Sequence, residues 1–248
     1  MTTIDLDDLD VAGIDDVPVT ESVRLHGPPG TGKTTQSAAR VGKLLRDHDY
    51  EVSDVAWATY RRSLAEDTLE RLAAWDLLDE DELDDPSEGA TRYIGTTHAI
   101  ANRITPSLPD PADRSDRIDF CDARGLQYTS PRPWDDGAGE MLFDAFAWLK
   151  QNRLDPADPS HARMWPGYTD LRETWDGDLP GVWLDWQDYK AQRELIDFYE
   201  MLERPLEKGL APSGPVLVVD EYHDATPLMA ELSEMWMDAA DIVIVAGD

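Results

Sequence analysis

The sequence predicts an α/β protein, in which a parallel sheet with helices on both faces is interrupted by a mainly helical inserted subdomain. Three observations lead to this fold class. Short apolar runs alternate with helical patterns up to residue 104, Pro-rich loops and longer helices replace them from residue 105, and the alternation resumes at residue 215. We therefore expect one α/β domain made of residues 1–104 and 207–248, and a helical insertion at residues 105–206.

The first α/β segment is expected to contain three strands, each followed by a helix. The strands are short and apolar, whereas the helices show an amphipathic period. A charged loop at residues 79–89 precedes the third strand. The expected strands cover residues 22–26, 52–59 and 91–96, and the expected helices cover residues 33–47, 63–78 and, at its beginning, 98–104.

The insertion shows two helical patterns, at residues 139–152 and 184–206, and Pro-rich loops at residues 105–116 and 129–137. Its tryptophans can form the core of the insertion or an aromatic surface for a partner, and the core is favoured for most of them. After the insertion we expect a strand at 215–220, a helix at 226–240 and a strand at 241–248. The tryptophans of the insertion are Trp134, Trp148, Trp165, Trp175, Trp183 and Trp186.

The composition excludes several classes of protein. The 248 residues include 52 Asp and Glu against 22 Lys and Arg, which gives a net charge of −30. The tryptophans and apolar strands argue against disorder, so the charge predicts a folded protein adapted to molar salt, where self-repulsion is screened. No apolar stretch is long enough to span a membrane, and the acidic N-terminus lacks the features of a secretory signal. We expect a halophilic, cytoplasmic protein, in which the single Cys121 excludes an internal disulfide.

The segment GPPGTGKTTQ at residues 27–36 has the spacing of a phosphate-binding loop between a strand and a helix. Its glycines allow backbone N–H groups to face the phosphates, and the helix N-terminus adds a partial positive charge. Lys33 would neutralise the β- and γ-phosphates, and the Thr34 hydroxyl would hold Mg²⁺. The sheet is therefore expected to be of the P-loop (RecA-like) kind, with ATP and Mg²⁺ as cofactors. The residues expected at the nucleotide are Gly27, Pro28, Pro29, Gly30, Thr31, Gly32, Lys33, Thr34 and Thr35.

The second part of the nucleotide site is expected at the end of the strand at 215–220. Asp220 would bind Mg²⁺ together with Thr34, and Glu221 would orient and deprotonate the attacking water. Lys33, Asp220 and Glu221 are therefore the expected catalytic residues of an ATP hydrolase. His223 could be a metal ligand, but a hydrogen-bonding link between the nucleotide site and the core is favoured.

Five segments of the α/β part follow one another in an informative order. They are GPPGTGKTT (27–35), AWATYRRSLAEDTLERL (56–72), IGTTHAIANRI (94–104), VVDEYHDATPLMAEL (218–232) and VIVAGD (243–248). Together they resemble the N-terminal motor domain of superfamily 1 DNA helicases of the UvrD/Rep type. The resemblance implies an ATP-driven helicase or translocase that moves 3′ to 5′ on single-stranded DNA. It also implies a base-stacking role for the aromatic ring at position 60. The DNA-binding residues it implies are Thr59, Tyr60, Arg61, Arg62, Thr96 and His98.

The sequence departs from this family at three places. No glutamine that would read adenine precedes the phosphate loop, and His223 stands where the family has a glutamine. The sequence ends within the family's third motif, so we expect a missing C-terminal part or another chain to supply the second motor domain and its arginine fingers. This chain alone would then bind and hydrolyse ATP weakly. Two alternatives stay open: an AAA+-like P-loop ATPase, and a nucleotide-regulated binding module with little turnover.

Overall fold

The computed structural model describes residues 17–75, 78, 89–128 and 137–248. The acidic N-terminus, most of the charged loop expected at 79–89, the loop at 129–136 and Trp134 lie outside the described residues. The chain divides into two compact units. Unit 1 comprises Met1–Pro106, Arg204–Ala225 and Met229–Asp248, and unit 2 comprises Ser107–Glu203 and Thr226–Leu228.

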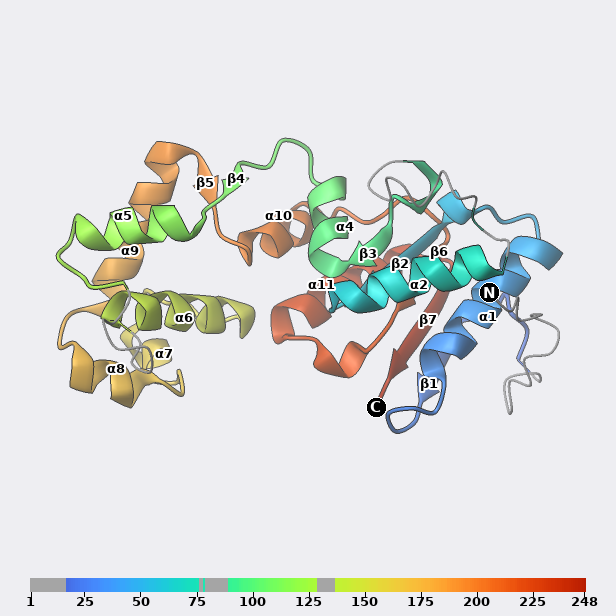
Figure 1. Ribbon diagram of the computed structural model, residues 1–248, viewed down its shortest axis with the longest axis horizontal. Helices are drawn as coiled ribbons and strands as arrows, with labels where there is room; N and C mark the ends of the chain where they lie inside the picture. Colours follow the sequence, from blue (N-terminus) through green and yellow to red (C-terminus); the bar gives the residue numbers. More distant parts are fainter. Residues whose placement is uncertain (1–16, 76–77, 79–88, 129–136) are drawn as a thin grey trace. The chain divides into compact units, whose positions relative to one another are not determined.

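Unit 1 is built on a five-stranded parallel sheet with the strand order β1-β7-β6-β2-β3 (Figure 1). This architecture confirms the α/β class predicted from the alternation of strands and helices. Each expected strand is present, within a few residues of its expected ends. The strands are β1 (Val23–His26), β2 (Val55–Thr59), β3 (Ile94–Thr96), β6 (Val216–Val219) and β7 (Ile242–Gly247).

Helices cover both faces of this sheet. The chain steps from β1 to β2 and β3 in one direction across the sheet, and from β6 to β7 in the other. Because parallel crossovers are right-handed, α1 (Lys33–Asp47) and α2 (Arg62–Ala74) cover one face and α11 (Pro227–Ala239) covers the opposite face. The other helical elements of this part are η2 (Val52–Asp54), η3 (Gly89–Thr91), α4 (Thr97–Ile104) and η4 (Tyr222–Asp224), and α10 (Glu200–Lys208) begins in unit 2 and ends in unit 1.

The main hydrophobic core of unit 1 lies between the sheet and helices α1 and α2. Alternate strand residues such as Val55 and Trp57 point into it and meet Val41 and Leu44 of α1. The residues between them are also buried, so β2 and β6 are covered on both faces. This explains why the strands read as continuous apolar runs that end at polar residues.

Unit 2 is mainly helical and has an aromatic core. Phe120 and Phe143 each pack edge-to-face on Trp186. Of the five described tryptophans of the insertion, Trp183 and Trp186 are buried, while Trp148, Trp165 and Trp175 are half-buried. The core position predicted for most of them is therefore confirmed for two. Its elements are β4 (Asp110–Pro111), α5 (Arg114–Asp122), α6 (Ala138–Gln151), α7 (Pro159–Ala162), α8 (Tyr168–Thr174), α9 (Leu179–Arg193) and β5 (Leu195–Ile196).

Two predictions about the insertion are wrong. The single helix expected at 184–206 is broken, because α9 ends at Arg193, the next residue, Glu194, has a left-handed conformation (φ 54°), and β5 intervenes before α10 begins. The second error is that part of the loop expected at 105–116 belongs to α5. Asp113 caps this helix and forms a capping box with Asp116, a signal that the prolines nearby concealed.

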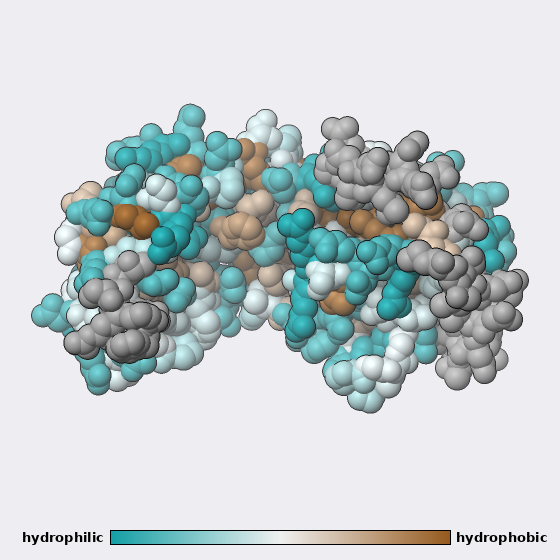
Figure 2. Space-filling model, viewed as in Figure 1, coloured by the Kyte–Doolittle hydropathy of each residue, from teal (hydrophilic) through white to brown (hydrophobic). Residues whose placement is uncertain are grey.

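The surface is strongly hydrophilic, as the composition requires. Figure 2 shows hydrophilic residues over much of the face in view, with hydrophobic residues visible in smaller groups. Within the described part of the chain, no helix combines the length and apolar character that a membrane span needs.

Candidate nucleotide site

The candidate site lies at the carboxyl ends of the strands, where ligands bind in parallel sheets. Strand β7 lies between β1 and β6, and His26 of β1 is paired with Gly247 of β7. The phosphate loop that follows β1 therefore begins next to Asp248. On the other side of β7, Val219 is paired with Val245, so Asp220 emerges at the same edge. The topology thus brings residues from both ends of the sequence together.

The phosphate loop has the backbone that its glycines predict. Gly30 and Gly32 have φ values of 80° and 82°, in the left-handed region that favours glycine. A Cβ at Gly27 would lie 3.0 Å from the hydroxyl oxygen of Thr31, which itself donates a hydrogen bond to Pro28 O at 2.8 Å. The loop is therefore closed tightly, and it leads directly into α1 at Lys33.

Lys33 is buried and its ammonium group is held at the loop. It donates hydrogen bonds to Gly27 O at 2.5 Å and to Pro28 O at 3.3 Å, and it forms an ion pair with the carboxylate of Asp248. This contact with Lys33 holds the pKa of Asp248 below its usual value. Asp248 therefore occupies a position on Lys33 that the phosphates of a nucleotide would take.

Asp220 is fully buried at the end of β6. Its Oδ1 accepts a hydrogen bond from the Glu221 N–H at 3.0 Å, whereas its buried Oδ2 accepts none among the described residues. Burial raises the pKa of Asp220, and the nearby side chain of Thr34 acts in the opposite direction. A buried carboxylate oxygen without a partner, next to a threonine hydroxyl, is a suitable oxygen donor set for Mg²⁺. Thr34 and Asp220 would hold the ion, which would neutralise phosphate charge when bound.

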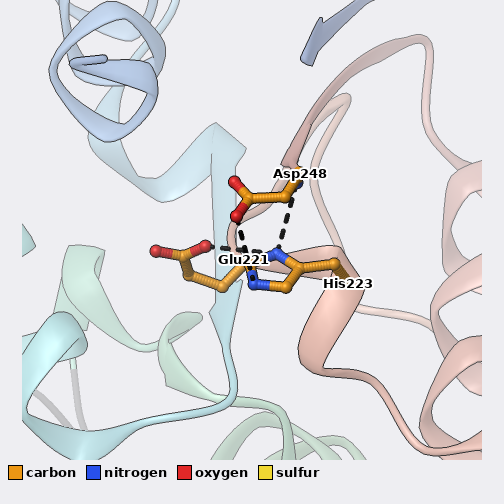
Figure 3. A group of neighbouring side chains, drawn as sticks. All are labelled: Glu221, His223 and Asp248. Carbon is orange, nitrogen blue, oxygen red and sulfur yellow. Dashed lines mark hydrogen bonds and ion pairs between the residues drawn. The ribbon is translucent and has the colours of Figure 1, made fainter. Parts of the chain in front are cut away.

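Glu221 lies at the start of η4 with a left-handed backbone (φ 56°). Such a conformation is uncommon for a residue other than glycine. The Glu221 Oε2 atom lies 3.4 Å from Nδ1 of His223 (Figure 3). The carboxylate is partly exposed, so it can reach a water molecule, as a general base must.

The imidazole of His223 lies near three carboxylates, those of Glu221, Asp224 and Asp248. Its Nδ1 accepts a hydrogen bond from the Asp248 N–H at 3.3 Å, so in the neutral ring the proton is on Nε2. Nε2 lies 3.5 Å from Oδ1 of Asp224 and 3.9 Å from Oδ2 of Asp248. Figure 3 shows the imidazole between Glu221 and Asp248, and each of these three residues offers an atom within 4.8 Å of the others. Among the described residues these contacts join His223 to partly exposed carboxylates, so the predicted link between the nucleotide site and the core stays a prediction.

A pocket of about 400 Å³ opens beside the phosphate loop. This volume is in the range of small-molecule sites. Gly27, Pro28, Thr31 and Lys33 line it, as the sequence predicts for nucleotide-binding residues. Arg24, His26 and Gln36 line it as well, although no sequence pattern predicted them there.

The remaining loop residues differ in their surroundings. Pro29 is exposed at the tip of the loop and offers only its backbone carbonyl. The Thr35 hydroxyl accepts a hydrogen bond from Arg71 of α2 at 2.6 Å. Thr35 therefore ties α1 to α2 through its side chain, although its backbone belongs to the first turn of α1.

The two segments expected to bind DNA lie next to each other at the same edge. Thr59 at the end of β2 is paired with Thr96 at the end of β3. Thr59 itself is fully buried, so its side chain supports the strand ends and does not reach the surface. Tyr60 is half-buried and shares a hydrogen bond of 3.3 Å with Ser233 of α11; burial raises the Tyr60 pKa to about 12.

Two exposed arginines, Arg61 and Arg62, follow Tyr60 in the sequence. Arg61 donates to Oδ2 of Asp224 at 2.9 Å, and Arg62 donates to Glu66 at 3.0 Å. These pairs link each guanidinium to a carboxylate in place of an external anion. Exposed pairs of this kind are worth at most about 1 kcal/mol, so both are easily exchanged.

The second segment is built around the start of α4. The Thr96 hydroxyl accepts a hydrogen bond from the Ala99 N–H at 3.2 Å and so caps the helix. Burial lowers the pKa of His98 from 6.5 to about 4, which keeps its imidazole neutral at neutral pH. His98 can therefore act only as a neutral hydrogen-bonding group.

A comparison with protein families decides the class. The family model of the AAA domain AAA_19 matches residues 14–248, which is nearly the whole chain. The chain belongs to this family. The AAA domain is a P-loop NTPase domain that is found in UvrD/Rep-like helicases. A search among curated proteins gave no match.

Membership of the AAA domain family agrees with the geometry around Lys33 and Asp220. The AAA domain binds nucleoside triphosphates and is of the type that hydrolyses them, typically with Mg²⁺. Two residues that the sequence analysis did not place in the site, Asp248 and Asp224, contact its predicted members. Asp248 follows the apolar strand β7, which lies between β1 and β6. Because parallel strands end at one edge of a sheet, this position could have indicated that Asp248 lies near the phosphate loop.

Proposed function

We propose that this AAA domain is the ATP-binding N-terminal part of an ATP-dependent 3′–5′ DNA helicase or translocase of the UvrD/Rep type. In this proposal it hydrolyses ATP in order to move on single-stranded DNA. The observation that carries the proposal is the pairing of Thr59 with Thr96. It brings the two segments of the DNA resemblance together, at the edge of the sheet that also holds the phosphate loop.

Each site residue then has a chemical role. The N–H groups of the loop and the Lys33 ammonium bind the phosphates, and Lys33 exchanges Asp248 for them. Glu221 orients the attacking water and accepts its proton. Asp220 and Thr34 are the residues that fit Mg²⁺. A segment that follows a neighbouring strand lies at the same edge of the sheet. It can therefore respond to ATP hydrolysis at this site.

Single-stranded DNA would lie across the ends of β2 and β3. Tyr60 would stack on a base, and Arg61 and Arg62 would bind phosphates after giving up their carboxylate partners. Thr96 and His98 would contact the backbone of the DNA. His98 would do so as a neutral group, since burial lowers its pKa to about 4. We also propose that a second motor domain supplies an arginine to the nucleotide, and that the protein works in the salt-rich cytoplasm of a halophile.

The test is the effect of single-stranded DNA on ATP hydrolysis and the binding of a labelled oligonucleotide, both over a range of KCl concentrations. We expect single-stranded DNA to bind and to raise turnover, and duplex DNA to do so less. Tyr60→Ala should weaken DNA binding by about tenfold, because stacking on one base is worth about 1–3 kcal/mol. Tyr60→Phe is the matched control: it keeps the ring, loses only the bond to Ser233, and should bind like the parent.

The alternatives make different predictions in the same experiment. ATP hydrolysis that DNA does not stimulate would favour an AAA+-like ATPase. Tight nucleotide binding with little turnover and no DNA binding would favour a nucleotide-regulated binding module. Either result would reject the helicase proposal.

A further inference from the structure

We propose that a chain of polar contacts makes nucleotide binding and phosphate binding at Arg61 mutually antagonistic. This chain of contacts runs from Lys33 through Asp248, His223 and Asp224 to Arg61. All five residues belong to unit 1. His223 and Asp224 are its positioning residues. The inference rests on the proposed function in one respect: it takes the phosphate at Arg61 to be that of single-stranded DNA.

The two ends of this chain have the same design. At the inner end a carboxylate, Asp248, is paired with Lys33, which must turn to the phosphates of the nucleotide. At the outer end a carboxylate, Asp224, is paired with Arg61 at 2.9 Å. Arg61 is two-thirds exposed, and guanidinium groups bind phosphate oxygens in a bidentate manner, so a phosphate can displace Asp224. Each ligand therefore releases one carboxylate.

The released carboxylates compete for one hydrogen-bond donor. Nδ1 of His223 accepts from the Asp248 N–H, which leaves Nε2–H as the donor of the neutral ring. Nε2 lies 3.5 Å from Asp224 and 3.9 Å from Asp248, close enough to serve either one after a small rotation but not both well. The imidazole of His223 thus has two positions, with Nε2–H bonded either to Asp224 or to Asp248. The nucleotide at Lys33 and the phosphate at Arg61 each change which position is favoured.

The sign of the coupling follows from this competition. When a nucleotide takes Lys33, the freed carboxylate of Asp248 takes the Nε2 proton of His223. A phosphate that then binds Arg61 leaves Asp224 without Arg61 and without the Nε2–H of His223. In the nucleotide-free protein Asp224 can still take this Nε2–H, so phosphate binding costs less free energy there. By thermodynamic reciprocity, a phosphate at Arg61 weakens nucleotide binding by the same factor. Apart from the buried Lys33, the side chains of this chain of contacts are partly exposed, so we expect a factor of about five, at the lower end of the usual range of coupling.

The experiment measures the dissociation constant of a fluorescent, non-hydrolysable ATP analogue with the full chain, in the absence of DNA. Arg61→Ala frees Asp224 as a bound phosphate would, so it should raise this dissociation constant about fivefold. In the Asp224→Asn background the same Arg61→Ala change should have no effect. Arg124→Ala is the control, because it breaks another arginine–aspartate pair, with Asp185 at 3.1 Å in unit 2, and should leave nucleotide affinity unchanged.

His223 variants separate positioning from folding. His223→Ala should abolish the effect of Arg61→Ala on nucleotide affinity, whereas His223→Gln, which keeps a neutral donor, should restore part of it. An unchanged dissociation constant in Arg61→Ala, or equal effects of Arg61→Ala in the parent and in Asp224→Asn, would overturn the chain of contacts.

Adding a short single-stranded oligonucleotide tests the identity of the outer ligand. In the parent it should raise the dissociation constant of the ATP analogue about fivefold, and in Asp224→Asn it should not. If Arg61→Ala has the expected effect but the oligonucleotide does not bind, the chain of contacts holds and the DNA proposal fails. If the oligonucleotide binds and leaves nucleotide affinity unchanged, the DNA proposal holds and the chain of contacts fails.

Discussion

The ends of the strands in unit 1 and the interior of unit 2 both contain clusters of charged residues, but the two clusters are arranged differently. At the strand ends, Glu221, His223 and Asp248 are each about one-third exposed. One neighbouring atom, Oδ2 of Asp220, is buried and accepts no hydrogen bond from any described residue. These charges can therefore exchange partners when a ligand arrives.

The cluster in unit 2 is closed. Lys190 and Asp197 are almost fully buried, 2.8 Å apart, and Lys190 is also paired with Glu200. Asp197 accepts further hydrogen bonds from Trp186 Nε1 at 2.8 Å and from the Tyr199 hydroxyl at 2.5 Å. The Lys190 ammonium lies 5.6–6.0 Å from three aromatic ring centres.

This difference separates a binding site from a structural network. Buried charges that are paired and hydrogen-bonded on every side hold a fold together, whereas charges with an open position, or with partners that are easily replaced, can bind ligands. The Lys190–Asp197 pair connects α9 to the turn before α10, which is where the helix expected at 184–206 is broken. We therefore interpret it as part of the folding of unit 2.

Glu221→Gln should have the largest effect at the strand ends. It should lower ATP turnover by about 10²–10⁴-fold, the usual contribution of a general base, and leave nucleotide binding intact. Steady-state hydrolysis and titration with the ATP analogue measure the two quantities. Glu66→Gln, at an exposed pair on α2, is the control and should turn over like the parent. Normal turnover in Glu221→Gln would remove Glu221 as the base.

Asp197→Asn should have the largest effect in unit 2. It removes the charge opposite Lys190 in a buried site, and such a loss costs about 3 kcal/mol of stability. Chemical denaturation of the variant and of an Asp185→Asn control should show this difference, because Asp185 belongs to an exposed pair. Nucleotide affinity should not change in a folded sample. If both variants lose equal stability, the contrast between a closed and an open cluster is wrong.

His98→Gln should have a smaller effect that depends on pH. Because burial lowers the His98 pKa from 6.5 to about 4, the unfolded chain binds a proton more readily than the folded protein between these values. The stability that His98 contributes is complete above about pH 6.5 and is lost as the pH falls towards 4, in total about 2–3 kcal/mol. Carboxylates titrate in the same range, so the measured quantity is the difference between variant and parent in the free energy of unfolding at pH 7 and pH 4.5. The same slope in both proteins would show that His98 is not buried in a neutral form. His48→Gln, at an exposed position, is the control.

The fold of unit 1 could be predicted because its signals are local. Glycine spacing, apolar runs and the position of Asp220 after such a run all lie within short segments, and the parallel order then places the strand ends at one edge. The same reasoning could not place Asp248 on Lys33 or Asp224 on Arg61, because these contacts join residues 215 and 163 positions apart. Nor could it show that the side chain of Thr59 is fully buried.

The inserted unit was harder to predict for a different physical reason. The spacing of Tyr189, Ile196 and Tyr199 is that of a helix, but the polar network around Asp197 fixes a turn at the middle of it. The contacts of Asp197 with Trp186 and Lys190 of α9 outweigh local helical preference, which amounts to less than about 1 kcal/mol per residue. Asp113 shows the converse case, where a local capping signal was present and prolines nearby obscured it.

The central claim is that the phosphate loop and the end of β6 form one site for a nucleotide and its metal ion. The most direct test is a crystal structure with Mg²⁺ and a non-hydrolysable ATP analogue. We expect Lys33 to leave Asp248 for the phosphates, and the Oδ2 atom of Asp220 to face the ion, directly or through water, beside Thr34. A nucleotide bound elsewhere, or Lys33 still paired with Asp248 while the loop is occupied, would contradict this account.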